Sequence, residues 1–195
     1  MAQSRFSHAI AEGDGISVIA AVEDADSARA AEQQRAEALV VRGDPAAIRA
    51  ASALPILWRA QVDLERASAV ADAVMLVFDA LDEEDGRLEE LHEQALELGL
   101  DCAVEVRDEE EIEHALDRVD PEIFLLSPAE AEDDETPLEV VLDLLAAVPA
   151  GKLAIADLAS PTRAAVLELE RAGCDAVIVH GREIAPLAGG PPPEV

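Results

Sequence analysis

The amino-acid sequence predicts an α/β protein, a small (β/α)8 barrel of the TIM type, from the number, composition and spacing of its apolar runs. Eight short runs rich in Val, Ile, Leu and Ala alternate with Ala- and Glu-rich segments along 195 residues. Each run is apolar at nearly every position, which is typical of parallel strands buried on both faces. Eight regularly spaced units favour a closed barrel over the runner-up, a doubly wound open sheet.

The expected strands follow one another at regular intervals from the N-terminus to the C-terminus. Their composition, rich in β-branched residues, distinguishes them from the Ala- and Glu-rich segments between them. In chain order they are Ile16–Val22, Ala38–Arg42, Pro55–Arg59, Ala73–Phe78, Cys102–Arg107, Glu122–Leu126, Leu153–Asp157 and Ala176–His180.

The segments between the strands carry helix signals. A residue suited to capping precedes Pro45 and Pro161, so we expect helices to begin there with proline at the first helical position. Gly99 and Gly173 are expected to end two helices. Within residues 88–98, leucine and alanine recur at helical spacing with glutamate on the other face. Amphipathic helices that cover the sheet are therefore expected.

The chain is expected to form one barrel domain over residues 1–188, followed by a Pro-rich tail over 189–195. After His180 only a short segment precedes this tail, so the eighth helix is expected to be truncated. A missing helix would leave apolar surface between the first and last strands. We therefore expect that a second copy of the chain or a different partner covers it.

The charge balance is strongly acidic, with 43 Asp and Glu against 14 Lys and Arg and a net charge of −29. Such a chain is expected to bind neither nucleic acid nor an anionic membrane surface, because both are polyanions. The sequence has one lysine, Lys152, and no tyrosine. Arginine kept at the expense of lysine on an acidic surface indicates a protein of a salt-rich cytoplasm. No apolar stretch reaches the ~18 residues that span a bilayer, and no signal peptide is evident.

Candidate catalytic residues lie at the carboxyl ends of the strands, which form the active face of this fold. Ala103, Glu105 and Arg107 share one face of their strand, because side chains alternate. If that face lines the barrel mouth, Glu105 is a desolvated carboxylate and a candidate general acid or base. Trp58 either packs against a covering helix or forms a wall of the site.

Five segments resemble one family of barrels. Residues 16–23 (ISVIAAVE) resemble ISVIAEIK, 54–59 (LPILWR) resemble LPVLRK, and 71–77 (ADAVMLV) resemble ADAVLLI. Residues 96–111 (LELGLDCAVEVRDEEE) are similar to ELGLDVLVEVHDEEE, and 171–179 (RAGCDAVIV) to AAGADAVLV. These are segments of the indole-3-glycerol-phosphate synthases. The resemblance covers nearly the whole chain, with a reduced N-terminal extension and eighth helix, and implies the same barrel.

The resemblance implies a lyase of tryptophan biosynthesis that closes a pyrrole ring with loss of CO2 and water, without cofactor or metal. The family uses a glutamate and a lysine on strand one, a lysine acid on strand three, a glutamate on strand five, an asparagine on strand six and a glutamate on strand seven. In this sequence those positions are Ala21, Glu23, Arg59, Glu105, Ser127 and Asp157. Only the strand-five glutamate is retained, and arginine cannot readily donate a proton.

The phosphate-binding positions of the family also differ. Ala159 replaces the glycine after strand seven. After strand eight, the remaining candidates for anion binding are Gly181 and Arg182. Lys152 precedes strand seven, at the opposite end of the barrel, so no lysine is available to the active face.

We therefore expect a diverged family member that has lost the synthase reaction and acts as a pseudoenzyme or as a binder of a small anionic, phosphorylated ligand. The expected site comprises Glu105, Arg59 and Asp157 as catalytic positions, with Arg182, Gly181, Ser127, Glu23 and Trp58 as binding positions. Three alternatives stay open at this point. One is an active synthase that uses Glu105 and Arg59. Another is a diverged lyase or isomerase with Glu105 as base. The third is a metal site formed by Glu23, Glu105, Asp157 and His180.

Overall fold

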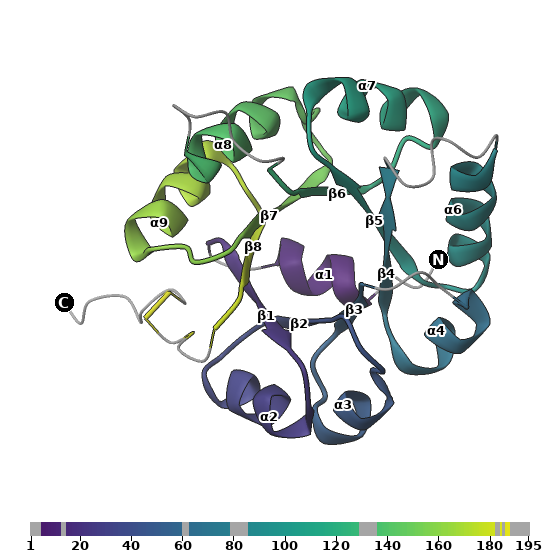
Figure 1. Cartoon of the computed structure of the whole chain (residues 1–195), viewed down its shortest axis with the longest axis vertical. Coiled ribbons are helices and arrows are strands. Elements are labelled where there is room, and N and C mark those ends of the chain that lie inside the picture. The colour runs from purple at the N-terminus through teal and green to yellow at the C-terminus, as the bar shows by residue number, and fades with distance from the viewer. Residues whose placement is uncertain are drawn as a thin grey trace.

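The computed structural model describes residues 5–12, 15–59, 63–78, 86–128, 136–181, 184 and 186–187. In this part of the chain eight parallel strands pair in sequence order, and β8 pairs with β1 to close a barrel (Figure 1). The predicted (β/α)8 barrel is confirmed. The strands are β1 (Ser17–Val22), β2 (Ala38–Val41), β3 (Ile56–Trp58), β4 (Ala73–Val77), β5 (Asp101–Val106), β6 (Ile123–Leu126), β7 (Leu153–Leu158) and β8 (Ala176–Val179).

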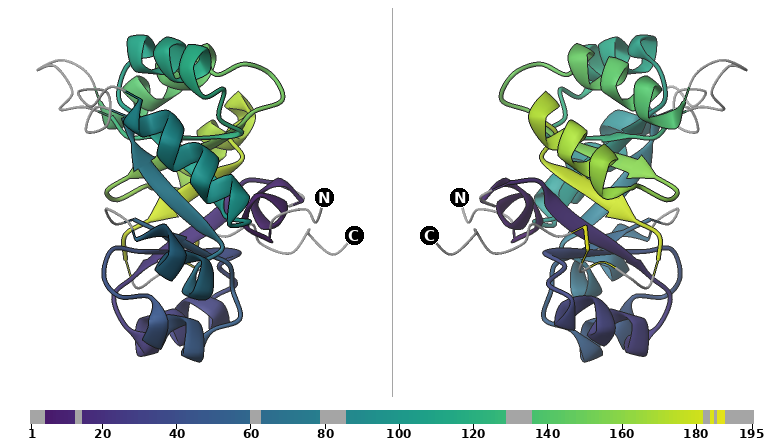
Figure 2. Two further views of the ribbon diagram at one scale, coloured as in Figure 1. Left: turned by 90° about the vertical axis from the view of Figure 1, so that its right-hand side faces the viewer. Right: turned by 90° about the vertical axis from the view of Figure 1, so that its left-hand side faces the viewer.

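The helices of the described residues lie outside the ring of strands, with the exception of the first helix (Figures 1 and 2). None of them is long and apolar enough to cross a membrane. They are α1 (Arg5–Ala11), α2 (Ala25–Gln33), α3 (Ala46–Ala51), α4 (Leu64–Val70), α6 (Arg87–Glu97), α7 (Glu109–Arg118), α8 (Pro137–Ala147) and α9 (Arg163–Ala172).

The strand boundaries agree with the predicted ones to within one residue, but two helix starts required correction. The helix expected to begin at Pro45 begins instead at Ala46, with Pro45 as its N-cap residue. The helix expected to begin at Pro161 begins instead at Arg163, because the hydroxyl of Thr162 accepts the N–H of Ala165 at 3.2 Å and so caps α9. Gly173 ends α9 with a φ of 92°, in the left-handed region where glycine has no steric penalty.

Three layers of four apolar side chains fill the barrel. Because side chains alternate along each strand, every second residue points inward, and the pairing register assigns these residues to layers. Odd-numbered and even-numbered strands supply alternate layers. From the amino end upward the layers are Ala38, Ala73, Ile123 and Ala176; then Ile19, Leu57, Ala103 and Ile155; then Val40, Met75, Leu125 and Ile178.

Helix α1 closes the amino end of this interior. It is seen through the ring of strands in Figure 1 and at one end of the barrel in Figure 2. Its Phe6 and Ile10 are buried in the interior cluster. The backbone N–H of Ser7 donates to Oδ2 of Asp101 at 2.7 Å, and the Ser17 hydroxyl donates to the carbonyl of Ile10 at 3.3 Å. The short N-terminal segment therefore acts as a plug.

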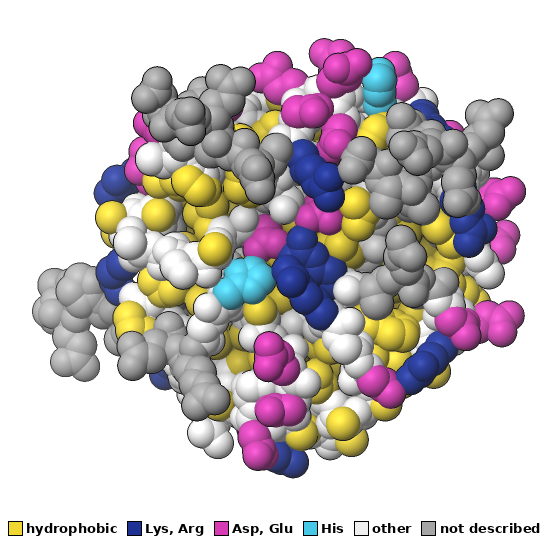
Figure 3. All heavy atoms as spheres, viewed as in Figure 1, with side chains coloured by type: hydrophobic (Ala, Val, Ile, Leu, Met, Phe, Trp, Pro, Cys, Tyr) yellow, Lys and Arg dark blue, Asp and Glu magenta, His cyan; other side chains and the backbone are white. Residues whose placement is uncertain are grey.

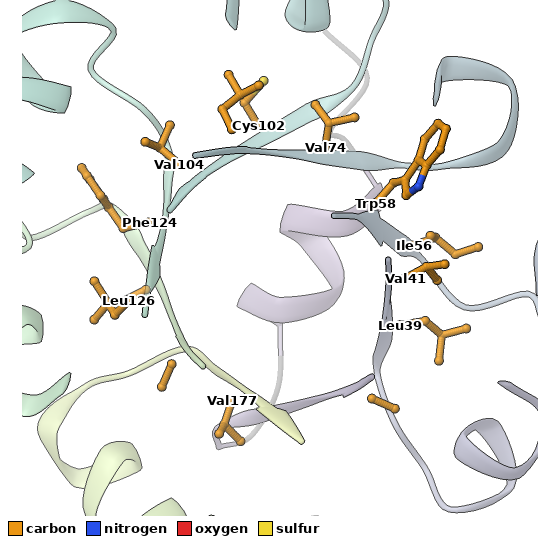
Figure 4. Close-up of a cluster of buried hydrophobic side chains, with 14 of the residues drawn as sticks. Leu39, Val41, Ile56, Trp58, Val74, Cys102, Val104, Phe124, Leu126 and Val177 are labelled. Atoms are coloured by element: carbon orange, nitrogen blue, oxygen red, sulfur yellow. The ribbon is translucent and has the colours of Figure 1, made fainter. Parts of the chain in front are cut away.

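The outward side chains of the strands pack against the helices in a second apolar cluster (Figure 4). No helix follows β8 within the described residues, yet the outward side chains of the two adjoining strands, Val18, Ala20, Val177 and Val179, are buried. Ile184 is buried in the same cluster, and its N–H donates to Oε1 of Gln34 at 2.8 Å. The apolar strip expected between the first and last strands is therefore not exposed, which corrects that expectation.

Three carboxylates repeat one arrangement at the amino end of the barrel. Each directly precedes an even-numbered strand and accepts a backbone N–H from the start of the preceding strand. Glu37 accepts from Val18 at 2.6 Å, Asp72 from Ile56 at 2.9 Å, and Asp175 from Ala154 at 2.8 Å. Burial raises the pKa of Glu37 and of Asp175, and their hydrogen bonds to the backbone offset part of that rise.

Removal of the Phe6 ring should destabilise the barrel strongly. Phe6 is fully buried in the interior, so Phe6→Ala is expected to lower the free energy of unfolding by about 3–5 kcal/mol. Leu96→Ala removes an apolar side chain that is 54 % exposed and should change it by less than about 0.5 kcal/mol. Denaturant unfolding of both variants checks this. Equal effects would show that α1 does not plug the barrel.

Glu37→Gln should stabilise the protein at neutral pH. The raised pKa means that ionised Glu37 opposes folding, and that this opposition disappears as the pH falls through the folded pKa towards the unfolded value of 4.5. The amide oxygen of glutamine can still accept the Val18 N–H. The stability difference between variant and parent should therefore be largest near neutral pH and shrink on acidification. A difference that does not change with pH would contradict this assignment.

Candidate functional site

The next layer of the barrel interior, at the carboxyl end, is polar. On each odd-numbered strand, the next inward residue lies two positions after the one in the middle apolar layer. The pairing register places these four side chains at one level. They are Ala21 at the end of β1, Arg59 directly after β3, Glu105 on β5 and Asp157 on β7. Each of these four residues occupies a position where the family has glutamate or lysine. The barrel therefore brings family positions from four different strands to one mouth.

Arg59 lies between the two carboxylates of this layer. Its Nη2 donates to Oε1 of Glu105 at 2.5 Å, and its Nη1 donates to Oδ2 of Asp157. The other carboxylate oxygen of Asp157, Oδ1, lies 2.6 Å from Nε2 of His180, which follows β8. Figure 3 shows dark-blue, cyan and magenta side chains gathered at the centre of this face of the barrel. We call Arg59, Glu105, Asp157 and His180 the mouth network.

Burial makes the mouth network a desolvated ion cluster rather than a surface salt bridge. The side chains of Glu105, Asp157 and Arg59 are 6 %, 8 % and 13 % exposed, and that of His180 is 29 % exposed. A buried carboxylate needs hydrogen-bond donors or a paired cation, and a guanidinium with its fork of N–H donors can serve two carboxylates at once. With a neutral imidazole the network carries one positive and two negative charges.

Trp58 lies away from the mouth. It precedes Arg59 on the strand, so its indole points outward into the cluster between sheet and helices (Figure 4). Its Nε1 donates to the carbonyl of Gly43 at 2.8 Å, and the guanidinium of Arg66 lies 5.8 Å from the ring centroid. The prediction that Trp58 binds ligand is therefore wrong, because strand alternation allows only one of the two neighbours to face the mouth.

The remaining expected binding residues lie at the ends of their strands. Glu23 is exposed just past β1, and its N–H donates to the Ser27 hydroxyl at 3.3 Å. Ser127 is half-buried, and its N–H donates to the carbonyl of Val106 at 3.0 Å. Gly181 is exposed, with open space where a side chain would be. Arg182 lies outside the described residues.

His180 is the member of the network that the sequence reasoning assigned only to a metal site. Its position could have been found by the same alternation that identified Glu105, because Ala176 and Ile178 face the interior and His180 is the next residue on that face. Among the described residues no group of three or more His, Cys, Asp or Glu side chains is arranged to hold a metal ion. The guanidinium of Arg59 lies between the carboxylates that would have been the ligands.

The other reactive side chains lie elsewhere. Lys152 precedes β7, and its Nζ donates to Oδ1 of Asp120 at 2.6 Å, at the amino end of the barrel. Burial raises the pKa of the Cys102 and Cys174 thiols to about 12, so neither is a nucleophile at neutral pH.

Several solved structures share the fold at low sequence identity. N-acetylmannosamine-6-phosphate 2-epimerase from Clostridium perfringens has a TM-score of 0.69 at 14 % identity, over 85 % of this chain and 86 % of that chain. A mutant tryptophan synthase alpha-subunit from Pyrococcus furiosus has a TM-score of 0.66 at 14 % identity, over 87 % and 88 %. Thiamine phosphate pyrophosphorylase from P. furiosus has a TM-score of 0.64 at 18 % identity, over 88 % and 90 %.

Curated relatives are more similar in sequence and are indole-3-glycerol phosphate synthases. That of Geobacillus sp. strain WCH70 is 31 % identical over 143 residues, which is 71 % of this chain and 55 % of that protein. That of Geobacillus kaustophilus is 38 % identical over 94 residues, 48 % of this chain and 35 % of that protein. The aligned part of the chain thus spans about half the length of these relatives, or less. The family model for indole-3-glycerol phosphate synthase matches residues 46–184, more than half of the chain, which therefore belongs to the indole-3-glycerol phosphate synthase family.

Proposed function

We propose that this family member has lost the synthase reaction and is a pseudoenzyme of the salt-rich cytoplasm, a barrel that binds or regulates rather than closes the indole ring. One observation carries the proposal. The cation at the strand-three position, Arg59, is held by Glu105 and Asp157. A side chain that neutralises two buried carboxylates is a structural counterion, and its withdrawal to contact a substrate would leave both carboxylates unpaired.

The lysine acid of the family reaction has no counterpart in this mouth. Ring closure requires a group that protonates a departing hydroxyl, for which the family uses lysine. A guanidinium keeps its proton throughout the accessible pH range. The single lysine, Lys152, lies at the other end of the barrel and bonds to Asp120.

The charge of the mouth network also opposes the family substrate, a carboxyphenylamino-deoxyribulose phosphate. That molecule carries a carboxylate and a phosphate, whereas Arg59 is outnumbered by Glu105 and Asp157. Glu23 stands exposed at the end of β1 where the family has a lysine. Like charges within a few ångströms of each other in a poorly solvated site repel strongly.

The alternative of an active synthase has one observation in its favour. Glu105, the retained strand-five glutamate, is buried and directly bonded to Arg59, as an acid–base residue beside a catalytic cation would be. A turnover experiment separates this alternative from the proposal.

The wild-type chain is expected to form no indole product from the carboxyphenylamino-deoxyribulose phosphate, in dilute buffer or in multimolar KCl. The reason is that the strand-three position holds Arg59, which keeps its proton, and that the single lysine of the chain, Lys152, lies at the other end of the barrel. Product is followed by absorbance and mass spectrometry, and binding by calorimetry, since Trp58 faces away from the mouth and is a poor reporter.

Product that falls by about 10²-fold or more in Glu105→Gln would overturn the proposal and establish the synthase. The matched control is Glu168→Gln, an exposed glutamate on α9 that should leave any turnover unchanged. Heat of binding without product would identify a ligand-binding barrel. Neither heat nor product would direct attention to a protein partner.

The structural role of Arg59 predicts a stability effect. Arg59→Met leaves Glu105 and Asp157 buried without their cation and should lower the free energy of unfolding by about 3–5 kcal/mol. In the background Glu105→Gln with Asp157→Asn, where no carboxylate remains to be paired, the same change should cost much less. Denaturant unfolding of the four proteins measures this coupling. Additive effects would show that Arg59 is not their counterion.

A further inference from the structure

The contact between His180 and Asp157 is not explained by the structural role of Arg59. Asp157 already has its cation, because Oδ2 accepts from Arg59. Its Oδ1 nevertheless lies 2.6 Å from Nε2 of His180. A carboxylate beside a guanidinium accepts hydrogen bonds, so the imidazole hydrogen is on Nε2 and the lone pair of the neutral ring is on Nδ1. Asp157 thus selects one tautomer of His180.

His180 has the most exposed side chain of the mouth network. The histidine side chain is 29 % exposed, whereas that of Asp157 is 8 % exposed. Within the described part of the chain no hydrogen bond is made to Nδ1 of His180. The next residue, Gly181, has no atom within 4 Å of where a side chain would begin.

A second group in the network can stabilise negative charge on a substrate. Arg59 uses one N–H of each terminal nitrogen for the two carboxylates, and a guanidinium has five. The Arg59 side chain is 13 % exposed, and it contacts the same carboxylate, that of Asp157, as His180 does. An N–H donor that faces a desolvated mouth is the kind of group that stabilises a developing oxyanion.

We infer that His180, oriented by Asp157, is a proton-transfer residue at the barrel mouth, and that its substrates are small uncharged hydroxycarbonyl compounds. The network of one cation and two carboxylates disfavours a phosphorylated substrate. The inference goes beyond the proposed loss of the synthase reaction, because it uses a residue that is none of the family positions named above.

The reaction is a reversible enolisation. Nδ1 of His180 takes the proton from the carbon next to the carbonyl group, and the electron pair of that C–H bond forms a C=C bond. The π electrons of the carbonyl group move to its oxygen, which Arg59 stabilises, to give an enediolate. The imidazolium returns a proton to the same carbon, or to the former carbonyl carbon when the hydroxyl proton of the enediolate moves to the other oxygen. Proton transfer alone balances the step, without oxidant, reductant or cofactor.

Dihydroxyacetone in D2O tests the inference. The protein should accelerate replacement of its C–H protons by deuterium above the buffer rate, as measured by 1H NMR. His180→Gln should reduce this acceleration by about 10²-fold or more, which is the contribution of a positioned acid–base group. His8→Gln, which changes an exposed histidine on α1, should leave it unchanged. Dihydroxyacetone phosphate should exchange more slowly than dihydroxyacetone.

The tautomer of His180 is measured separately by 15N NMR of the histidine side chains in the wild-type protein, which requires no variant to fold. The inference expects hydrogen on Nε2, and a shift of that preference in Asp157→Asn. Hydrogen on Nδ1 in the wild type, exchange no faster than in buffer, or exchange that survives His180→Gln would overturn it. Faster exchange of the phosphate would overturn the substrate class. Synthase turnover is a separate assay, so either conclusion can fail alone.

Discussion

Closure of the sheet into a barrel with a regular stagger between strands is the constraint on which the rest of the molecule depends. From each strand to the next but one, the register advances by two residues. Inward side chains from alternate strands therefore meet at one level. The same stagger that interleaves Ile19 with Leu57 at the centre brings Arg59 to Glu105 and Asp157 at the mouth. A one-residue shift of any strand would turn its inward side chains outward.

The two ends of the barrel handle carboxylates differently. At the amino end Glu37, Asp72 and Asp175 accept backbone N–H groups from the starts of neighbouring strands, and α1 seals the interior. Those carboxylates satisfy donors that the closed sheet leaves unpaired. At the carboxyl end Glu105 and Asp157 are instead satisfied by the side chains of Arg59 and His180. Stability and site are therefore separated along the barrel axis, as is usual for this fold.

The residues at the mouth differ from those of the family, whereas the apolar interior of the barrel beneath them is intact. The apolar layers beneath and the outward contacts of the strands are those of an intact barrel. Within the polar layer, Arg59 replaces a proton donor with a permanent cation that holds two buried charges. Buried ion pairs of this kind contribute little net stability over apolar residues, yet they are costly to break. Under the proposed loss of the family reaction, such a network keeps its structural role and also includes His180.

Sequence alone determined the fold and the strand boundaries to within one residue, because runs of apolar residues are typical of strands buried on both faces, and strand alternation assigns Glu105 to the inner face. The family was inferred separately, from the five segments that resemble indole-3-glycerol-phosphate synthases. It could not determine which strand ends meet. The contact of Arg59 with Asp157 joins residues 98 apart, and that of His180 with Asp157 depends on the β7–β8 register. The tertiary structure also decided the outward direction of the Trp58 indole and the burial of the apolar strip between β1 and β8. Both depend on packing against neighbours that are distant in sequence.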